Sequence, residues 1–236
     1  MENIKLFATK QLRSNYEDST SYVEPYVSLE EEENEVNYND VSFIRITVGE
    51  GRSITMQGGT TLSSGEHTIN MKQGYRTSLG ITDGKEYIQE LDLFDYNRKT
   101  IEQYYFEGFT NLRKVYLSNK INNIKESAFN NCTYLENVIN TENIEAIGSN
   151  AFANCVNLES FTFSDKIKNV ATNAFSNCPH LTNITFKSKT HQSYFVTILN
   201  SINTVQNIYV PQDAVQTYKT APGWERYVSM IKPIEE

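Results

Sequence analysis

The hydrophobic positions of residues 113–181 recur every 23 residues. Three consecutive copies, 113–135, 136–158 and 159–181, align without a gap. Seven columns hold an apolar side chain in every copy, and the middle copy shows them as Val138, Ile144, Ile147, Ala151, Phe152, Cys155 and Leu158. A strict period in the twenties is typical of a solenoid, in which each coil buries its apolar residues by stacking on its neighbours. We therefore predict a stack of coils that share one core.

The pattern continues in weaker form on both sides of the three copies. A degenerate copy with one extra residue precedes them, and its core positions are Leu91, Leu93, Ile101, Phe106, Phe109 and Leu112. A fifth copy begins at Thr182 and loses the Ala-Phe and Cys positions after Lys187. Its core face is expected to continue at Ile198, Ile202 and Val205.

One position of the middle copy interrupts the pattern. Asn140 stands where the other copies place an apolar residue, namely Leu117, Phe163 and Phe186. Two outcomes are open: the middle coil is locally distorted, or Ile139 takes the inward place.

The segment 41–93 shows short apolar runs separated by turn residues, which is typical of strands. We expect a small module of four to six strands. It would cap the first coil, because an open solenoid end exposes unpaired strand groups and core side chains. The expected strands are 43–48, 53–56, 67–71 and 87–93, with turns at 49–51, 58–59, 63–65 and 83–84.

The C-terminal residues 208–236 predict a second cap. A last strand is expected at 208–210, followed by a short helix with Asp213 as its N-cap and an end at Pro222-Gly223. Apolar residues then recur at helical spacing from Trp224 to Ile231, which predicts an amphipathic helix that closes the last coil. Trp224 is interpreted as a packing anchor of this cap.

Charge separates the N-terminal segment from the rest of the chain. The formal net charge is −8, and residues 1–40 hold ten acidic against three basic residues, a net charge of −7. Without a basic stripe a nucleic-acid partner is excluded. The segment is either a solvating tail or an anchoring arm that orders on a partner, and its apolar and aromatic content favours the arm. The candidate anchoring residues are Leu6, Phe7, Leu12, Tyr16, Tyr22, Tyr26 and Val27.

Neither a secretory signal nor a membrane span is apparent in the sequence. The first residues contain no apolar h-region, and no window approaches 18 apolar residues. We expect a protein that stays in a cytoplasm or leaves by lysis, or one whose signal was removed.

No motif for catalysis, a cofactor or a metal appears. His67, His180 and His191 lie in different segments, and Gly58-Gly59 and Asp83-Gly84 are interpreted as turns. The three cysteines occupy one column of the repeat, where neighbouring coils bring equivalent positions within disulfide range. We prefer buried, reduced thiols that act as small apolar residues.

The repeating unit, I-x-x-I followed by A-F-x-N-C-x-x-L, resembles the BspA-type leucine-rich repeat, and the ending IYVP…YK…W…IKPI resembles the cap that often follows such repeats. The resemblance covers about residues 88–236. It implies a non-catalytic, right-handed solenoid that serves attachment to proteins, cells or matrix. We therefore expect a mainly β leucine-rich-repeat solenoid of about five coils, divided into an arm (1–40), a β module (41–87), a solenoid (88–207) and a short α-helical cap (208–236).

The arm and its lack of a signal resemble structural proteins of tailed phages from gut anaerobes. This resemblance implies a virion component, such as a head fibre, capsid decoration or tail protein. The arm would bind the capsid or tail and the repeats would bind a host-surface protein or glycan. A homo-oligomer stays open. The alternative is a bacterial cell-surface adhesin, and a glycan-processing enzyme is a third class.

Alternation along the strands predicts a binding face, because neighbouring residues point to opposite sides of a sheet. If the apolar columns face inward, one set of residues faces outward. This candidate face, whose alternative is an inert solvated surface, consists of Lys114, Tyr116, Asn137, Ile139, Ser160, Thr162, Asn183 and Thr185. Asn131, Asn154 and Asn177 are expected to form an internal ladder that hydrogen-bonds turn backbones.

Overall fold

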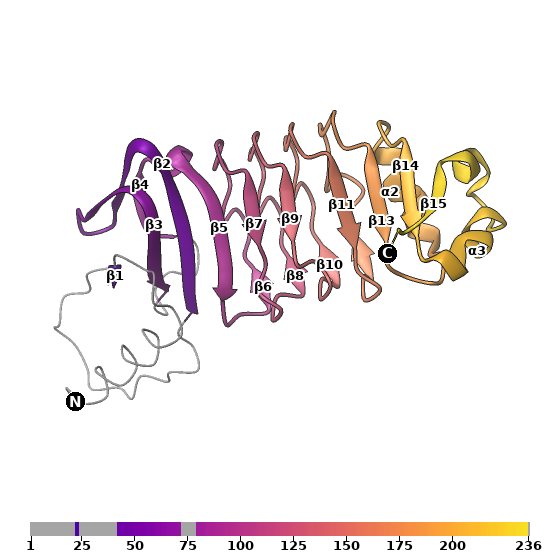
Figure 1. Ribbon diagram of the computed structural model, residues 1–236, viewed down its shortest axis with the longest axis horizontal. Coiled ribbons are helices and arrows are strands. Elements are labelled where there is room, and N and C mark those ends of the chain that lie inside the picture. The colour runs from indigo at the N-terminus through magenta and orange to yellow at the C-terminus, as the bar shows by residue number, and fades with distance from the viewer. Residues whose placement is uncertain (1–21, 24–41, 72–78, 236) are drawn as a thin grey trace.

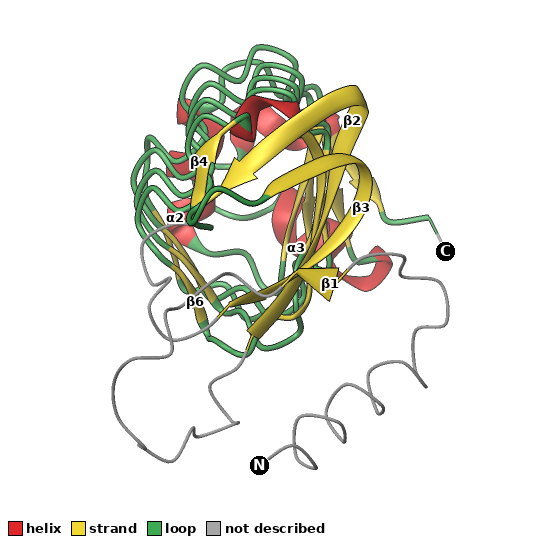
Figure 2. Cartoon of the chain, turned by 90° about the vertical axis from the view of Figure 1, so that its left-hand side faces the viewer, coloured by secondary structure: helices red, strands yellow, loops and turns green. Residues whose placement is uncertain are grey.

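The protein is an elongated stack of coils with a different cap at each end (Figure 1). The computed structural model describes residues 22–23, 42–71 and 79–235. Parallel strands, one or two from each coil, form the walls of the stack, and the loops that connect them stack as well (Figure 2). This arrangement is a mainly β solenoid, the stack of coils that the periodicity predicts.

The first and largest sheet carries the N-terminal cap and the first coils. Its strand order is β1-β3-β2-β5-β7-β9, with β4 paired to β2. Strands β1, β2 and β3 belong to the cap, and β5, β7 and β9 come from successive coils. Their bounds are Tyr22–Val23 (β1), Ser42–Met56 (β2), Thr61–Met71 (β3), Ile81–Asp83 (β4), Ile88–Asp95 (β5), Lys114–Tyr116 (β7) and Asn137–Ile139 (β9).

Two further parallel sheets complete the solenoid. The second has the order β12-β10-β8-β6 and the third β11-β13-β14-β15. The second sheet consists of Thr100–Ile101 (β6), Asn123–Ile124 (β8), Ala146–Ile147 (β10) and Asn169–Val170 (β12). The third consists of Ser160–Phe163 (β11), Asn183–Phe186 (β13), Asn207–Val210 (β14) and Ile231–Pro233 (β15).

Equivalent residues of successive coils lie in register. Val115 pairs with Leu91 on one side and with Val138 on the other, as the alignment of the repeats predicts. The residues of the Phe column are buried and stack face to face, with ring centroids 5.1 Å apart for Phe106 and Phe129 and 5.3 Å apart for Phe129 and Phe152. Each coil therefore supplies the packing surface for the next one.

The cysteine column is buried and its three thiols are free, in agreement with the structural interpretation. Each sulfur lies at hydrogen-bond distance from a phenylalanine carbonyl of the preceding coil. The distances are 3.3 Å from Cys132 to Phe106, 3.4 Å from Cys155 to Phe129 and 3.1 Å from Cys178 to Phe152. The column thus joins coils through weak S–H donors rather than through disulfides.

The N-terminal module packs on the first coil, as predicted. Strand β5 pairs antiparallel with β2 and parallel with β7, so it belongs to both parts. The turns predicted at 49–51 and 63–65 are wrong, because β2 and β3 run through both positions. The register between them shifts from Val48 to Ser53, so a bulge accommodates the glycines inside the strands. Gly51 and Gly65 take positive φ there, 66° and 121°.

The fifth coil has a helix, α2 (Ser193–Ser201), in place of the missing repeat pattern, and this helix was not predicted from the sequence. All three expected core residues are buried. Ile198 lies in this helix, Ile202 directly follows its last residue, and Val205 lies three residues farther along the chain. The Tyr194 hydroxyl donates to the Ile167 carbonyl at 2.7 Å, which fixes α2 on the preceding coil.

The C-terminal cap differs from the prediction in three details. Strand β14 is not the last strand, because β15 pairs with it and Ile231 lies beside Ile208. The predicted amphipathic helix is a 3-10 helix (Glu225–Met230) that leads into β15. Asp213 caps no helix: its carboxylate accepts a hydrogen bond from Lys189 at 2.6 Å, and α3 (Val215–Lys219) already ends before Pro222.

Trp224 is a packing anchor, as predicted. Its side chain is fully buried. Its ring packs edge-on against those of Tyr218 and Phe186, with ring centroids 4.9 Å and 6.0 Å apart.

In the described part of the chain no helix is both long and apolar enough to cross a membrane.

The middle coil is locally distorted at Asn140, which was one of the two outcomes left open. Asn140 is exposed and adopts φ of 64°, so β9 ends one residue before it. Val138 keeps the inward column, and Ile139 pairs with outward-facing Tyr116. No residue pairing joins β9 to β11 within the described ranges, so the first sheet ends at β9 and the third begins at β11.

Candidate functional site

The predicted face lies on the outer side of β7, β9, β11 and β13. All eight of its residues alternate with inward-facing residues, and each is exposed or half-buried. The register arranges them in two rows that run along the stack. One row joins Lys114 to Asn137 and Ser160 to Asn183, and the other joins Tyr116 to Ile139 and Thr162 to Thr185. Both rows are interrupted where β9 and β11 are unpaired.

The face extends beyond the predicted residues at both ends. Towards the N-terminus, Glu90 lies beside Lys114 and Asp92 beside Tyr116, and Thr47 and Arg45 of β2 continue the two rows. Towards the C-terminus the rows continue with Asn207, Tyr209 and Lys232, of β14 and β15. The N-terminal module therefore contributes to the face that the repeats form.

The N-terminal end of this face is hollowed and charged. A hollow of about 200 Å³ is lined by Arg45, Thr47, Glu66, Glu90, Asp92 and Tyr116. The Arg45 guanidinium lies 3.0 Å from the Glu66 carboxylate and 3.7 Å from that of Asp92. At the edge of the hollow, the Lys114 ammonium lies 3.5 Å from Glu90.

Asp92 is a half-buried acid of the hollow. Burial raises its pKa above the ordinary value, and the nearby Glu66 carboxylate acts in the same direction. The Arg45 guanidinium and a hydrogen bond from the Phe94 N–H oppose this effect without cancelling it. Burial therefore outweighs the stabilisation that Arg45 and the Phe94 N–H give to the ionised carboxylate.

The C-terminal half of the face is chemically different. Its outward side chains on β11 and β13 are hydroxyls and amides, and its only cation among the extended rows is Lys232. The Asn207 amide donates to the Asn183 amide oxygen at 2.8 Å, and Lys232 donates to the Asn207 oxygen at 2.7 Å. These bonds link the polar groups of consecutive coils.

The predicted asparagine ladder exists, but its partners differ from the prediction. The Asn154 amide donates to the Asn131 oxygen at 2.9 Å and the Asn177 amide to the Asn154 oxygen at 2.7 Å. The side chains thus bond to one another rather than to turn backbones, and Asn131 and Asn177 are exposed. All three adopt left-handed φ values of 56° to 61°, a conformation that asparagine tolerates better than most residues.

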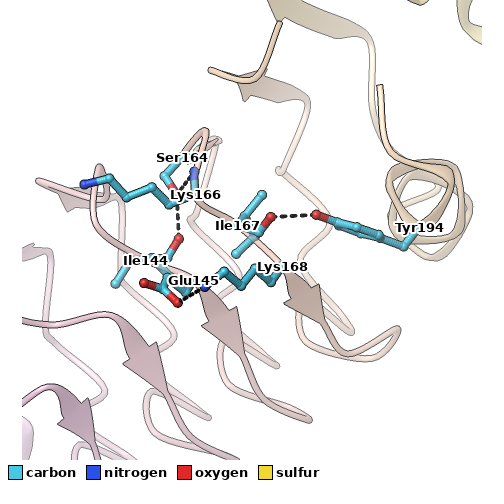
Figure 3. Close-up of polar contacts among 7 residues, drawn as sticks. All are labelled: Ile144, Glu145, Ser164, Lys166, Ile167, Lys168 and Tyr194. Atoms are coloured by element: carbon cyan, nitrogen blue, oxygen red, sulfur yellow. Dashed lines mark hydrogen bonds and ion pairs between the residues drawn. The ribbon is translucent and has the colours of Figure 1, made fainter. Parts of the chain in front are cut away.

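Polar contacts on the turns also join successive coils (Figure 3). The Lys168 ammonium lies 2.6 Å from Glu145, and the Lys166 ammonium donates to Asn143 at 2.5 Å. The hydrogen bond from Lys168 lowers the pKa of Glu145. The Ser164 hydroxyl donates to the Ile144 carbonyl at 2.5 Å. These contacts stabilise the stack and form no site.

The histidines lie on separate elements. His67 on β3 is buried, with its Nε2 2.6 Å from the Ser63 carbonyl, whereas His180 is exposed and His191 lies beside Tyr218. Among the described residues no group of three or more His, Cys, Asp or Glu could hold a metal ion.

One of the candidate anchoring residues lies in the described structure. Tyr22 is in β1, which pairs in parallel with β3 beside Thr68 and Ile69. The other six, Leu6, Phe7, Leu12, Tyr16, Tyr26 and Val27, lie outside the described residues. The anchoring role stays a prediction.

The charged hollow was not predicted from the sequence. Glu90 and Asp92 could have been found, because they alternate with the core residues Leu91 and Leu93 of the degenerate copy. Arg45 and Glu66 could not, since their place beside Asp92 depends on how β2 and β3 pair with the first coil.

Comparisons with known proteins agree with the geometry. The model of a family described as BspA type leucine rich repeat region matches six copies across residues 99–221. No curated protein sequence matches the chain. Nothing in the comparisons supports the virion role that the arm led us to expect.

Several solved structures of leucine-rich repeat proteins resemble the chain. The T. pallidum protein TpLRR is 21% identical over 48% of this chain and 54% of its own, with a TM-score of 0.39. A Bacteroides ovatus leucine-rich repeat protein is 15% identical over 71% of this chain and 40% of its own, with a TM-score of 0.44. The pneumococcal vaccine antigen PcpA is 15% identical over 78% and 48%, with a TM-score of 0.44. The chain spans about half of these proteins or less.

The family match covers more than half of the 236 residues and coincides with the coils that the structure shows. Its repeats supply the strands, the Phe column and the Cys column described above. The chain belongs to the BspA-type leucine-rich repeat family.

Proposed function

We propose that this protein is a non-enzymatic adhesion protein that presents the outer face of its first and third sheets to a macromolecular partner. The observation that carries this proposal is the register of the coils. Within each of these two sheets it aligns the outward side chains of successive strands in two rows, which is how solenoids build extended binding surfaces. A protein or glycan that extends along the stack could contact several coils at once.

The proposed location is the bacterial cell surface. Membership of the BspA-type family supports attachment to proteins, cells or matrix, and this fits a surface adhesin better than a virion component. The segment division stays part of the proposal: residues 1–40 anchor the chain, 41–87 and 208–236 close its ends, and 88–207 bind the partner.

A binding assay with matched variants tests the face. The probes are cultured epithelial cells and immobilised collagen, fibronectin and mucin. Thr162→Lys combined with Thr185→Lys places two charges on the proposed face and should abolish binding. Asn123→Lys combined with Asn169→Lys places the same charges on the outer side of β8 and β12, where binding should persist.

Both double variants should keep the thermal unfolding midpoint of the wild type, because all four positions point away from the core. Equal loss of binding in the two variants would contradict the assignment of the face. Turnover of any polysaccharide by the purified chain would contradict the non-enzymatic part.

Location is tested separately. Antibodies raised against residues 99–221 should label intact cells of the source organism. Labelling of purified virions instead of cells would overturn the surface proposal and support the virion hypothesis.

A further inference from the structure

We infer that the hollow at the N-terminal end of the face binds one arginine side chain of the protein partner. This inference rests on the proposed function and adds the chemical class of the contact. The hollow lies between the β module and the first coil, on the outer side of β2, β3, β5 and β7. It therefore unites residues that the repeat alone does not supply.

The size of the hollow selects a single side chain. Its volume of about 200 Å³ is several times the ~30 Å³ that one water molecule takes in the liquid. It falls short of the roughly 300–1,000 Å³ that is usual for small-molecule and cofactor sites. One long side chain of a partner fits between these limits.

The charge of the hollow selects a cation. Glu66, Glu90 and Asp92 place three carboxylates on its lining, against one guanidinium from Arg45. Lys114 at the edge compensates only Glu90. Burial, more than the neighbouring charges, raises the pKa of Asp92. A bound cation would lower that pKa, because it favours the ionised carboxylate.

The chemistry of the lining selects an organic cation over a metal ion. The three carboxylates are spread over β3 and β5, and no acid or histidine cluster suited to a metal exists among the described residues. The hollow instead offers an aromatic ring, Tyr116, beside the carboxylates. Guanidinium groups bind carboxylates through paired hydrogen bonds and stack on aromatic rings.

Two further polar groups of the lining are available to a ligand. Within the described structure the hydroxyls of Thr47 and Tyr116 have no hydrogen-bond partner. Arg45 is already held by Glu66 and Asp92, and its guanidinium lies 5.1 Å from the centre of the Phe94 ring. It forms a fixed wall of the hollow, which positions the acids for a second guanidinium.

Titration of the full chain with short peptides, followed by NMR, tests the inference. The probes are acetyl-Gly-Arg-Gly-amide and the same peptide with citrulline, the neutral isostere of arginine. The arginine peptide should shift the signals of Glu66, Glu90, Asp92 and Tyr116 and lower the pKa of Asp92. The citrulline peptide should bind at least about tenfold more weakly, because it forms no charge-assisted bonds.

Matched variants locate the binding. Asp92→Asn keeps the oxygen that accepts the Phe94 N–H and removes the charge, and should weaken the arginine peptide about tenfold or more. Asp165→Asn removes an exposed acid on a distant turn and should have no effect. Affinity should fall as salt is added, as screening requires.

Four results would overturn the inference: equal binding of the two peptides, equal binding of a lysine peptide, equal effects of the two variants, or displacement by calcium chloride at an ionic strength at which sodium chloride leaves the peptide bound. Failure of the proposed function is a different result. If the arginine peptide binds in the hollow but the Thr162 and Thr185 variants leave adhesion intact, the cation site stands and the proposed face does not.

Discussion

The phenylalanine column is where one side chain contributes most to the stack. Phe152 is fully buried between Phe129 and Phe175, with centroid distances of 5.3 Å to each. Phe152→Ala should lower the free energy of unfolding by about 3–5 kcal/mol, because it removes a buried ring and leaves a cavity. Urea unfolding measures this change. Thr162→Ala, on the outer face, should cost less than about 0.5 kcal/mol, and equal losses would mean that the two faces are reversed.

The buried thiols predict a loss of stability at high pH. Burial raises the pKa of Cys132 from 9.0 to about 12 and that of Cys178 to about 11. The folded protein keeps these thiols protonated, whereas the unfolded chain loses their protons above pH 9. Stability from this source is complete below pH 9 and is lost as the pH rises towards the folded values.

The measurement is the free energy of unfolding from pH 8 to 11. Each buried thiol should contribute a slope of up to about 1.4 kcal/mol per pH unit. Buried Tyr105 and Tyr218, whose pKa values are also raised, act in the same direction. Cys132→Ala should therefore reduce the slope without removing it. An unchanged slope in this variant would show that the thiol does not carry the effect.

The structural role of a single residue could be predicted where all three copies hold the same kind of residue at that position. The columns of Phe152 and Cys155 were assigned correctly, because three aligned copies leave few alternatives. The hydrogen-bond partners of the Asn154 side chain were not predicted correctly, because its left-handed backbone turns the amide towards its neighbours in the ladder. A periodic sequence identifies a column but gives no information about φ within a turn.

At the scale of elements, the unpaired boundary between β9 and β11 predicts a local difference in hydrogen exchange. The Asn183 N–H donates to the Glu159 carbonyl at 3.1 Å, whereas Ser160, its equivalent one coil earlier, has no such bond to Glu136. The Ser160 amide should therefore exchange faster than that of Asn183. Exchange followed by NMR at neutral pH measures both, and equal protection would show that the two strands pair in solution.

Elements were predicted well where their pattern is local and less well where pairing decides. The strands of the coils follow from alternation alone. The segment from Trp224 to Ile231 reads as a helix in sequence, but the ladder with β14 makes Ile231 part of a strand. The bulge in β2 likewise depends on its two partners, β3 and β5. Contacts distant in sequence determine both outcomes.

At the scale of the whole molecule, the common register predicts that one complete coil can be removed. Deletion of 136–158 joins Leu135 to Glu159, so that Phe129 would stack on Phe175 and β7 would lie beside β11. It also removes Asn140 and the sheet boundary that follows it. The shortened protein should fold cooperatively with a lower free energy of unfolding, because it loses one interface between coils.

Circular dichroism during thermal unfolding measures this outcome. Deletion of 136–146 is the control, since eleven residues shift every later column out of register and should prevent folding. Equal behaviour of the two deletions would show that the register is not what stabilises the stack.

The unlike caps have a consequence for how such a protein changes in length. The antiparallel β module closes one end and the helices around Trp224 close the other, so neither cap can stack on a copy of itself as a coil does. New units enter only between them. Each duplication of 23 residues would move the C-terminal cap by one strand spacing, about 4.8 Å, away from the arginine hollow. The distance between two contact points on a ligand would then vary in fixed steps, and the number of repeat copies would set that distance.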